Sequence, residues 1–114
     1  MNRIISFPPI AQKNAKILIL GSMPGKASLD KQQYYAHPRN KFWPVICELF
    51  DQDSTELTYT EKCELLLSKN IALWDVLKCC TRQGSLDSAI KKEEPNNFEE
   101  FLTAHPDIIR IGLN

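Results

Sequence analysis

Apolar residues gather in three short runs that predict buried strands. Residues 16–20 (KILIL) form a continuous apolar run that ends at Gly21, and residues 71–77 and 108–113 form two more. Runs of this length, bounded by turn-forming residues, are typical of strands that are covered on both faces.

Between these runs, apolar residues recur at the spacing of a helix. This pattern predicts helices at residues 42–50, 58–69 and 98–104. The second of these begins with Thr58 and Glu61, the spacing of a capping box. Strands that alternate with helices predict an α/β fold with a parallel sheet and right-handed crossovers.

The composition is that of an ordinary globular protein. The chain has 114 residues, of which 43% are hydrophobic and 25% are charged, so we expect a single domain over residues 1–114. No apolar run is long enough for a membrane span, and the first residues do not resemble a secretory signal. We therefore expect a cytoplasmic protein with no membrane partner.

The four cysteines do not have the spacing of a metal site. Cys47, Cys63, Cys79 and Cys80 include no Cys-x-x-Cys pair, and no histidine lies at ligand spacing beside them. We interpret them as free thiols in a reducing compartment, and we expect no metal and no organic cofactor.

Charge is divided unevenly along the chain. Up to Pro44 there are seven basic residues and one acidic residue, whereas the rest of the chain has seven basic and thirteen acidic residues. The basic part contains a long polar segment, residues 21–43. A partner that carries phosphate groups would favour this segment.

Segment 21–43 opens with a Gly-x-x-Pro-Gly turn directly after the first predicted strand. Glycine lets a ligand approach the main chain, and main-chain N–H groups in such a turn can meet an anion. The turn lacks the Gly-Lys-Ser/Thr ending of a P-loop, and it is not the dinucleotide-binding fingerprint. Taken alone, it leaves a phosphate- or nucleotide-binding α/β module open as an alternative.

The turn and the residues that follow it resemble the uracil-DNA glycosylase superfamily, and most of all its hypoxanthine-DNA (deoxyinosine) glycosylase branch. Residues 73–90 also resemble that branch, and the likeness spans residues 7–114. The residues that match the superfamily pattern are Gly21, Pro24, Gly25, Tyr35, Pro38, Asn40, Phe42 and Trp43.

The resemblance implies a three-layer α/β/α domain that hydrolyses the N-glycosidic bond of a deaminated base, hypoxanthine or uracil. The implied partner is double-stranded DNA that contains such a base, and a monomer is expected. The nucleotide would be flipped out of the duplex before the bond is broken.

The resemblance also implies roles for particular residues. Asn40 matches the catalytic residue, although a helix cap before Phe42 is its structural alternative. Met23 stands where many members of the superfamily have a water-orienting polar residue, and Tyr35 would stack on the base. The expected base-binding residues are Gly21, Ser22, Met23, Pro24, Gly25, Tyr35 and Asp75. The expected DNA-phosphate contacts are His37, Arg39, Lys41, Arg82 and Ser85.

The resemblance further implies that family members continue beyond the strand at residues 108–113, where this chain has Gly112-Leu113-Asn114. A last strand and a Ser-Pro loop would follow in the family. We therefore expect a C-terminally truncated member, for which a catalytically inactive fragment is an alternative to an active enzyme.

Overall fold

The computed structural model describes residues 3–114 of the chain. In chain order the elements are β1 (Ile4–Ile5), β2 (Ile17–Gly21), α1 (Lys26–Lys31), α2 (Phe42–Leu49), η1 (Ser54–Glu56), α3 (Tyr59–Ser68), β3 (Ile71–Asp75), β4 (Leu77–Thr81), η2 (Asp87–Ala89), β5 (Lys91–Pro95), α4 (Phe98–Ala104) and β6 (Arg110–Leu113).

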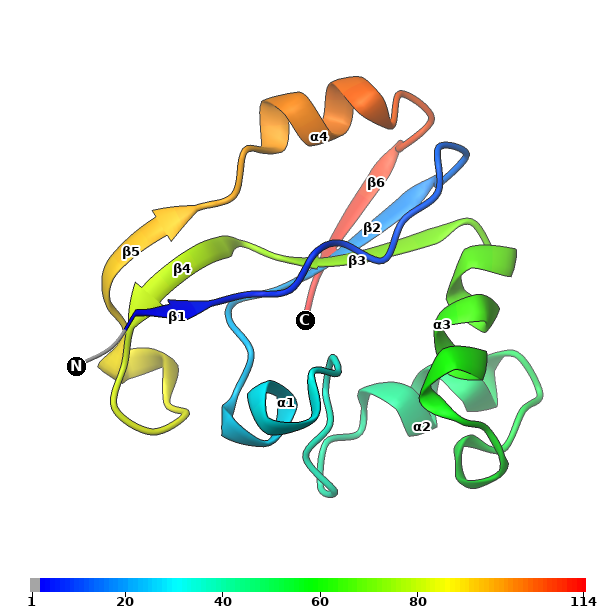
Figure 1. Ribbon diagram of the computed structural model, residues 1–114. Coiled ribbons are helices and arrows are strands. Elements are labelled where there is room, and N and C mark those ends of the chain that lie inside the picture. Colours follow the sequence, from blue (N-terminus) through cyan, green and yellow to red (C-terminus); the bar gives the residue numbers. More distant parts are fainter. Residues whose placement is uncertain (1–2) are drawn as a thin grey trace.

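A three-stranded parallel sheet lies at the centre of the fold, with the strand order β3-β2-β6. Helix α4 lies on one side of it, and α1, α2 and α3 lie on the other side (Figure 1). The expected α/β/α layers with a short parallel sheet are therefore confirmed.

Alternating side chains of β2 and β3 divide the interior into two clusters. On the α2 and α3 side, Leu73 packs with Trp43, Ile46 and Leu66. On the α4 side, the cluster is formed by Leu18, Leu20, Ala72 and Phe101. Because helices cover both faces of the sheet, these strands are apolar on both faces.

The three predicted helices are present, and local capping explains where two of them begin. Thr58 accepts a hydrogen bond from the Glu61 N–H, and the Glu61 carboxylate accepts one from the Thr58 N–H, which completes the capping box of α3. Asn97 caps α4 through the N–H of Glu100. Pro44 lies in the first turn of α2, where its missing N–H costs nothing.

The prediction of one strand over residues 71–77 is wrong in part. The run divides at Val76, and β4 leaves the parallel sheet to pair antiparallel with β1 and β5. Val76 lies at the bend, where its N–H donates to the Gly21 carbonyl (2.7 Å).

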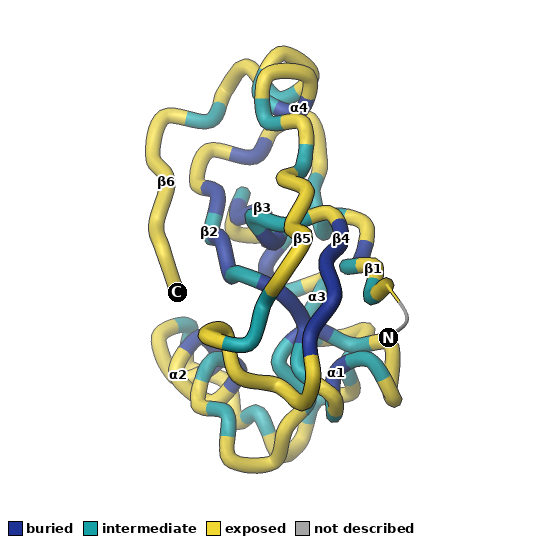
Figure 2. The backbone as a smooth tube through the Cα atoms, turned by 90° about the vertical axis from the view of Figure 1, so that its left-hand side faces the viewer, coloured by how far each residue is buried: buried dark blue, intermediate teal, exposed yellow. Residues whose placement is uncertain are grey.

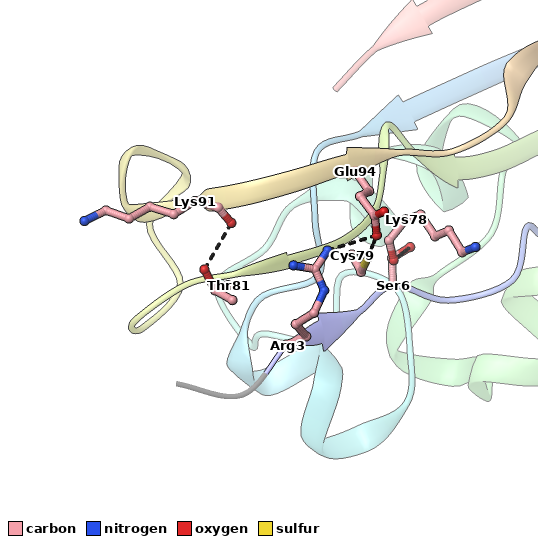
Figure 3. Close-up of polar contacts among 7 residues, drawn as sticks. All are labelled: Arg3, Ser6, Lys78, Cys79, Thr81, Lys91 and Glu94. Atoms are coloured by element: carbon pink, nitrogen blue, oxygen red, sulfur yellow. Dashed lines mark hydrogen bonds and ion pairs between the residues drawn. The ribbon is translucent and has the colours of Figure 1, made fainter.

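The second sheet has the order β1-β4-β5 and is joined by side chains as well as by its ladder. Arg3, directly before β1, forms an ion pair with Glu94 (2.9 Å), and the Cys79 thiol donates to the same carboxylate (2.8 Å). Figure 3 shows this contact between the three strands. Thr81 adds a hydrogen bond from its hydroxyl to the Lys91 carbonyl.

Strand β6 forms one open edge of the parallel sheet and is exposed along its length (Figure 2). Ile109, Ile111 and Leu113 have 75%, 53% and 82% of their surface exposed. Within residues 3–114, no helix has the length and apolar character that a membrane crossing requires. All four cysteines are free thiols.

Candidate active site

A cavity of about 290 Å³ opens at the carboxyl ends of the three parallel strands. Register explains why these ends meet: Gly21 of β2 pairs with Asp75 of β3, and Leu20 pairs with Leu113 of β6. Open α/β sheets bind their ligands at this edge. The lining residues include Gly21, Ser22, Met23, Pro24, Gly25, Ser28, Tyr34, Tyr35, His37, Asn40, Asp75, Ser85 and Asn114.

Gly21 is the point at which the cavity wall is tightest. A Cβ atom at this position would lie 2.6 Å from the Asp75 Oδ1 atom and 2.8 Å from the Tyr35 hydroxyl oxygen. Real Cβ contacts are essentially never that short. Glycine therefore lets these two polar side chains approach the end of β2.

Asp75 is 3% exposed, and its Oδ2 atom has no hydrogen-bond partner within residues 3–114. Burial raises the pKa of this carboxyl group to about 6, and the nearby charge of Asp87 adds to the effect. A buried carboxyl group with a raised pKa and a free oxygen atom, placed in a cavity, is typical of a functional site.

Asn40 lies at the start of α2 and also lines the cavity, and its catalytic role stays a prediction. Its Oδ1 atom accepts the N–H of Phe42 (2.8 Å) at the start of α2, so it does act as a cap. The same side chain lines the cavity. Because the oxygen atom is engaged, the Nδ2 amide group is the part that can reach a ligand, and it can only donate.

Tyr35 is half-buried and has a left-handed main-chain conformation, with a φ of 53°. Its ring packs against Phe42 with a centroid distance of 4.3 Å. Its hydroxyl group points to Gly21 and has no hydrogen-bond partner in the described part of the chain. Left-handed conformations are uncommon for aromatic residues and mark strained positions that surrounding structure must hold. The ring forms a wall of the cavity, and stacking on a base stays a prediction.

The neighbouring residue, Tyr34, anchors this strained segment. Its hydroxyl donates to the Pro8 carbonyl (2.8 Å), and its own carbonyl accepts the indole N–H of Trp43 (2.7 Å). Burial moves the pKa of Tyr34 far above its usual value, so it stays neutral. Both tyrosines line the cavity, but the Tyr34 hydroxyl is hydrogen-bonded to the main chain, whereas the Tyr35 hydroxyl has no partner within residues 3–114.

The predicted glycine turn is held from outside by the loop at residues 82–88. Ser22 donates its hydroxyl to Asp87 (2.9 Å), and Ser85 accepts the N–H of Lys26 (2.9 Å). Met23 and Pro24 are buried in the turn. The five turn residues expected to bind a base do line the cavity, and their contact with a base stays a prediction.

The predicted DNA-phosphate contacts fall into two groups. His37, Arg39 and Lys41 are exposed together on the loop before α2, as a phosphate contact requires. Arg82 is only 5% exposed, and its guanidinium donates to main-chain carbonyl groups. Ser85 lies at the cavity, where its hydroxyl accepts a main-chain N–H. The structure therefore places Arg82 under the turn instead of on the surface.

Asn114 and Ser28 line the cavity but were not among the predicted site residues. Asn114 lies one residue past the end of β6, and its N–H donates to the Leu20 carbonyl (2.8 Å). A signal was present, because a polar residue directly after a predicted strand falls at the edge that binds ligands. Ser28 gave no such signal, since its position depends on the fold of α1.

A metal-binding arrangement is not formed by the described residues. Within residues 3–114, no three side chains of histidine, cysteine, aspartate or glutamate lie close enough together to hold an ion. What the cavity offers is a buried carboxyl group, an amide donor, an aromatic wall and a turn of main-chain N–H groups.

Comparison with known proteins finds matches over nearly the whole chain. The family model of the uracil DNA glycosylase superfamily matches residues 8–112. The hypoxanthine DNA glycosylase of Methanosarcina barkeri is 41% identical over 108 residues, which are 95% of this chain and 68% of that protein. The hypoxanthine DNA glycosylase of Methanosarcina acetivorans is 39% identical over the same shares of each chain.

A solved structure agrees with these matches. The solution NMR structure of a candidate uracil DNA glycosylase from Methanosarcina acetivorans superposes with a TM-score of 0.87 at 37% identity. The superposition covers 99% of this chain and 70% of that one.

Proposed function

Because the chain belongs to the uracil DNA glycosylase superfamily, we propose that it is a DNA glycosylase that removes the deaminated bases hypoxanthine and uracil. The reaction hydrolyses the bond between the base and its deoxyribose and leaves an abasic site. The main support for this proposal is that Asn40, Tyr35 and Asp75 line one cavity beside the glycine turn.

The shape of the site supports a flipped base as the ligand. A cavity of about 290 Å³ at the end of a sheet cannot receive a base that is still stacked in a duplex, so the nucleotide must leave the helix. Tyr35 then offers a ring face for stacking. Asp75 lines the same cavity, and its buried, unpaired Oδ2 atom would accept a hydrogen bond from the edge of the base.

Asp75 also suggests how a deaminated base is distinguished from the adenine or cytosine that it came from. Hypoxanthine and uracil both carry a ring N–H beside a carbonyl group, whereas adenine and cytosine carry an unprotonated ring nitrogen there. An ionised carboxylate accepts a hydrogen bond from the N–H and repels the unprotonated nitrogen. A site with a buried polar group discriminates well, because the wrong base leaves that group unpaired.

Bond breakage places negative charge on the departing base and positive charge on the sugar. The N–H groups of the glycine turn are suited to stabilise the base as it leaves. Asn40 cannot act as a base, since an amide does not accept a proton at neutral pH. Its Nδ2 group positions the attacking water molecule or the sugar.

DNA is the partner that the basic segment fits. His37, Arg39 and Lys41 lie exposed beside the cavity and would neutralise the phosphates that flank the flipped nucleotide. We propose that the protein binds duplex DNA as a monomer and works in the cytoplasm.

An incision assay tests the proposed function. Duplex oligonucleotides with one hypoxanthine, one uracil or only normal bases are incubated with the 114-residue chain, and abasic sites are then cleaved with alkali. We expect cleavage at hypoxanthine and at uracil, and none in the normal duplex. If no duplex is cleaved, this chain is not an active glycosylase.

A further inference from the structure

Arg82 is a buried cation directly behind the cavity turn. Its side chain is 5% exposed; its Nε–H group donates to the Gly84 carbonyl (2.9 Å), and Nη2 donates to the Pro24 carbonyl (2.5 Å). The third nitrogen, Nη1, is buried and has no hydrogen-bond partner within residues 3–114.

No carboxylate compensates this charge. Across residues 3–114 the structure contains one ion pair, Arg3 with Glu94, which lies in the other sheet. Burying a cation without an ionic partner costs several kcal/mol. If the side chain at this position only had to hold the turn in place, a neutral hydrogen-bond donor would do so at a lower cost. The arrangement indicates that the positive charge itself is used.

Through its contact with Pro24, the positive charge of Arg82 can act on a peptide group that borders the cavity. The Pro24 carbonyl and the Gly25 N–H belong to one peptide group, and Gly25 lines the cavity. The Gly25 N–H donates to no acceptor in the described part of the chain. A cation that binds a carbonyl polarises the peptide, and the N–H at its other end becomes a stronger donor.

The rest of the 82–88 loop keeps this peptide in place. Ser85 accepts the N–H of Lys26, one residue after Gly25, and Asp87 accepts the Ser22 hydroxyl. With Arg82, the loop therefore contacts the turn at three points. The turn is fixed before any ligand arrives, as electrostatic stabilisation of a transition state requires.

We propose that Arg82 is a positioning residue for base release, which acts through the Pro24–Gly25 peptide. It orients and polarises that peptide so that the Gly25 N–H stabilises the negative charge on the departing base. The inference rests on the proposed function, and it replaces the predicted contact of Arg82 with a DNA phosphate.

The test compares Arg82→Met, which keeps much of the side-chain volume without charge, with Arg82→Lys, which keeps the charge. Arg110→Met on exposed β6 is the control for loss of an arginine. Single-turnover base release and the Kd for hypoxanthine-containing duplex are measured for each protein. In parallel, the amide resonance of Gly25 is followed in ¹H–¹⁵N spectra.

Loss of one preorganised donor typically lowers a rate by about 100- to 1,000-fold, so weakening one should cost roughly 10- to 100-fold. We expect that loss in Arg82→Met, with the DNA Kd nearly unchanged, partial recovery in Arg82→Lys, and no effect in Arg110→Met. The Gly25 amide resonance should move in Arg82→Met alone. If Arg82→Met does not fold, Arg82→Gln takes its place as the uncharged variant, because glutamine keeps N–H donors without the charge.

Two results would overturn the inference. The first is full activity of Arg82→Met with an unchanged Gly25 resonance. The second is a Kd that rises as much as the rate falls, the result expected for a phosphate contact. If the wild type releases no base, the proposed function fails for this chain, and the Gly25 resonance alone decides whether Arg82 controls that peptide.

Discussion

At the residue scale, the cavity contains polar atoms that the protein leaves without partners. The Tyr35 hydroxyl and Asp75 Oδ2 lack hydrogen-bond partners within the described residues. Buried polar groups are normally paired, because an unpaired one costs roughly 1–3 kcal/mol. Both residues line the cavity, so we propose that a ligand pairs with these atoms, and their cost to stability is measurable.

We predict that Asp75→Asn stabilises the protein at pH 8 and not at pH 4. The folded protein binds the Asp75 proton up to a pKa of about 6, whereas the unfolded chain releases it near pH 4. Stability is therefore lost as the pH rises from about 4 to 6 and stays low above that range. At about 1.4 kcal/mol per pKa unit, the amide should recover about 2–3 kcal/mol at pH 8.

Urea unfolding of both proteins at the two pH values measures this difference. The substitution preserves the side-chain shape, so a change in packing should affect both pH values equally. A gain of equal size at pH 4 and pH 8 would show that the carboxylate charge is not the cause.

Sequence could predict which residues surround the cavity better than it could predict what they touch. Asn40 was open to two interpretations, catalysis or capping, and the structure shows that its oxygen atom caps α2 while its amide group remains available. Arg82 was predicted at the DNA surface, yet it is buried. Its position depends on the turn at Pro24, which lies 58 residues away in the chain.

At the element scale, the predictable parts are those with a local signal. Helices α3 and α4 have their own caps, and β2 has a continuous apolar run. Strand β5 consists of Lys-Lys-Glu-Glu-Pro and has no such signal. It is extended because it pairs with β4, which is a tertiary contact that periodicity does not record.

Gly21, at the end of β2, can be substituted to test whether this strand positions Asp75 and Tyr35 in the site. We predict that Gly21→Ala lowers base release roughly tenfold or more, because the new methyl group displaces Asp75 and Tyr35 from the cavity wall. Both displaced atoms lie at the ends of side chains, so the free energy of unfolding should change by less than about 1 kcal/mol.

Gly112→Ala in β6 is the matched control, since a Cβ atom there meets nothing within 4 Å. Single-turnover rates and urea unfolding are measured for both variants. Equal rates for Gly21→Ala and Gly112→Ala would contradict the assignment of Asp75 and Tyr35 to the site.

At the scale of the whole molecule, the chain spans about two thirds of the length of the relatives that it matches. Strand β6 has a free edge, and Ile111 and Leu113 of this strand are exposed to solvent, as is Ile109 directly before it. An open apolar edge promotes association between chains, and lysine on such an edge opposes it.

We therefore predict that the chain is monomeric when dilute and self-associates as its concentration rises, and that Ile111→Lys suppresses this association. Leu86→Lys is the control, because Leu86 is an exposed apolar residue in a loop, with 71% of its surface exposed against 53% for Ile111. Sedimentation velocity over a concentration series measures the effect. Identical profiles for the two variants would show that the β6 edge is not responsible.

We propose that Asn40 acts on the substrate and does not merely cap α2, and the variant Asn40→Asp separates these two roles. Aspartate keeps the oxygen atom that accepts the Phe42 N–H and replaces the amide donor with a second acceptor. Single-turnover release of hypoxanthine is measured for the wild type, Asn40→Asp and Asn40→Ala, together with their unfolding. We predict that Asn40→Asp retains wild-type stability and loses activity by roughly 100-fold, as Asn40→Ala does. Activity that survives in Asn40→Asp and falls only when the cap is lost would contradict the account.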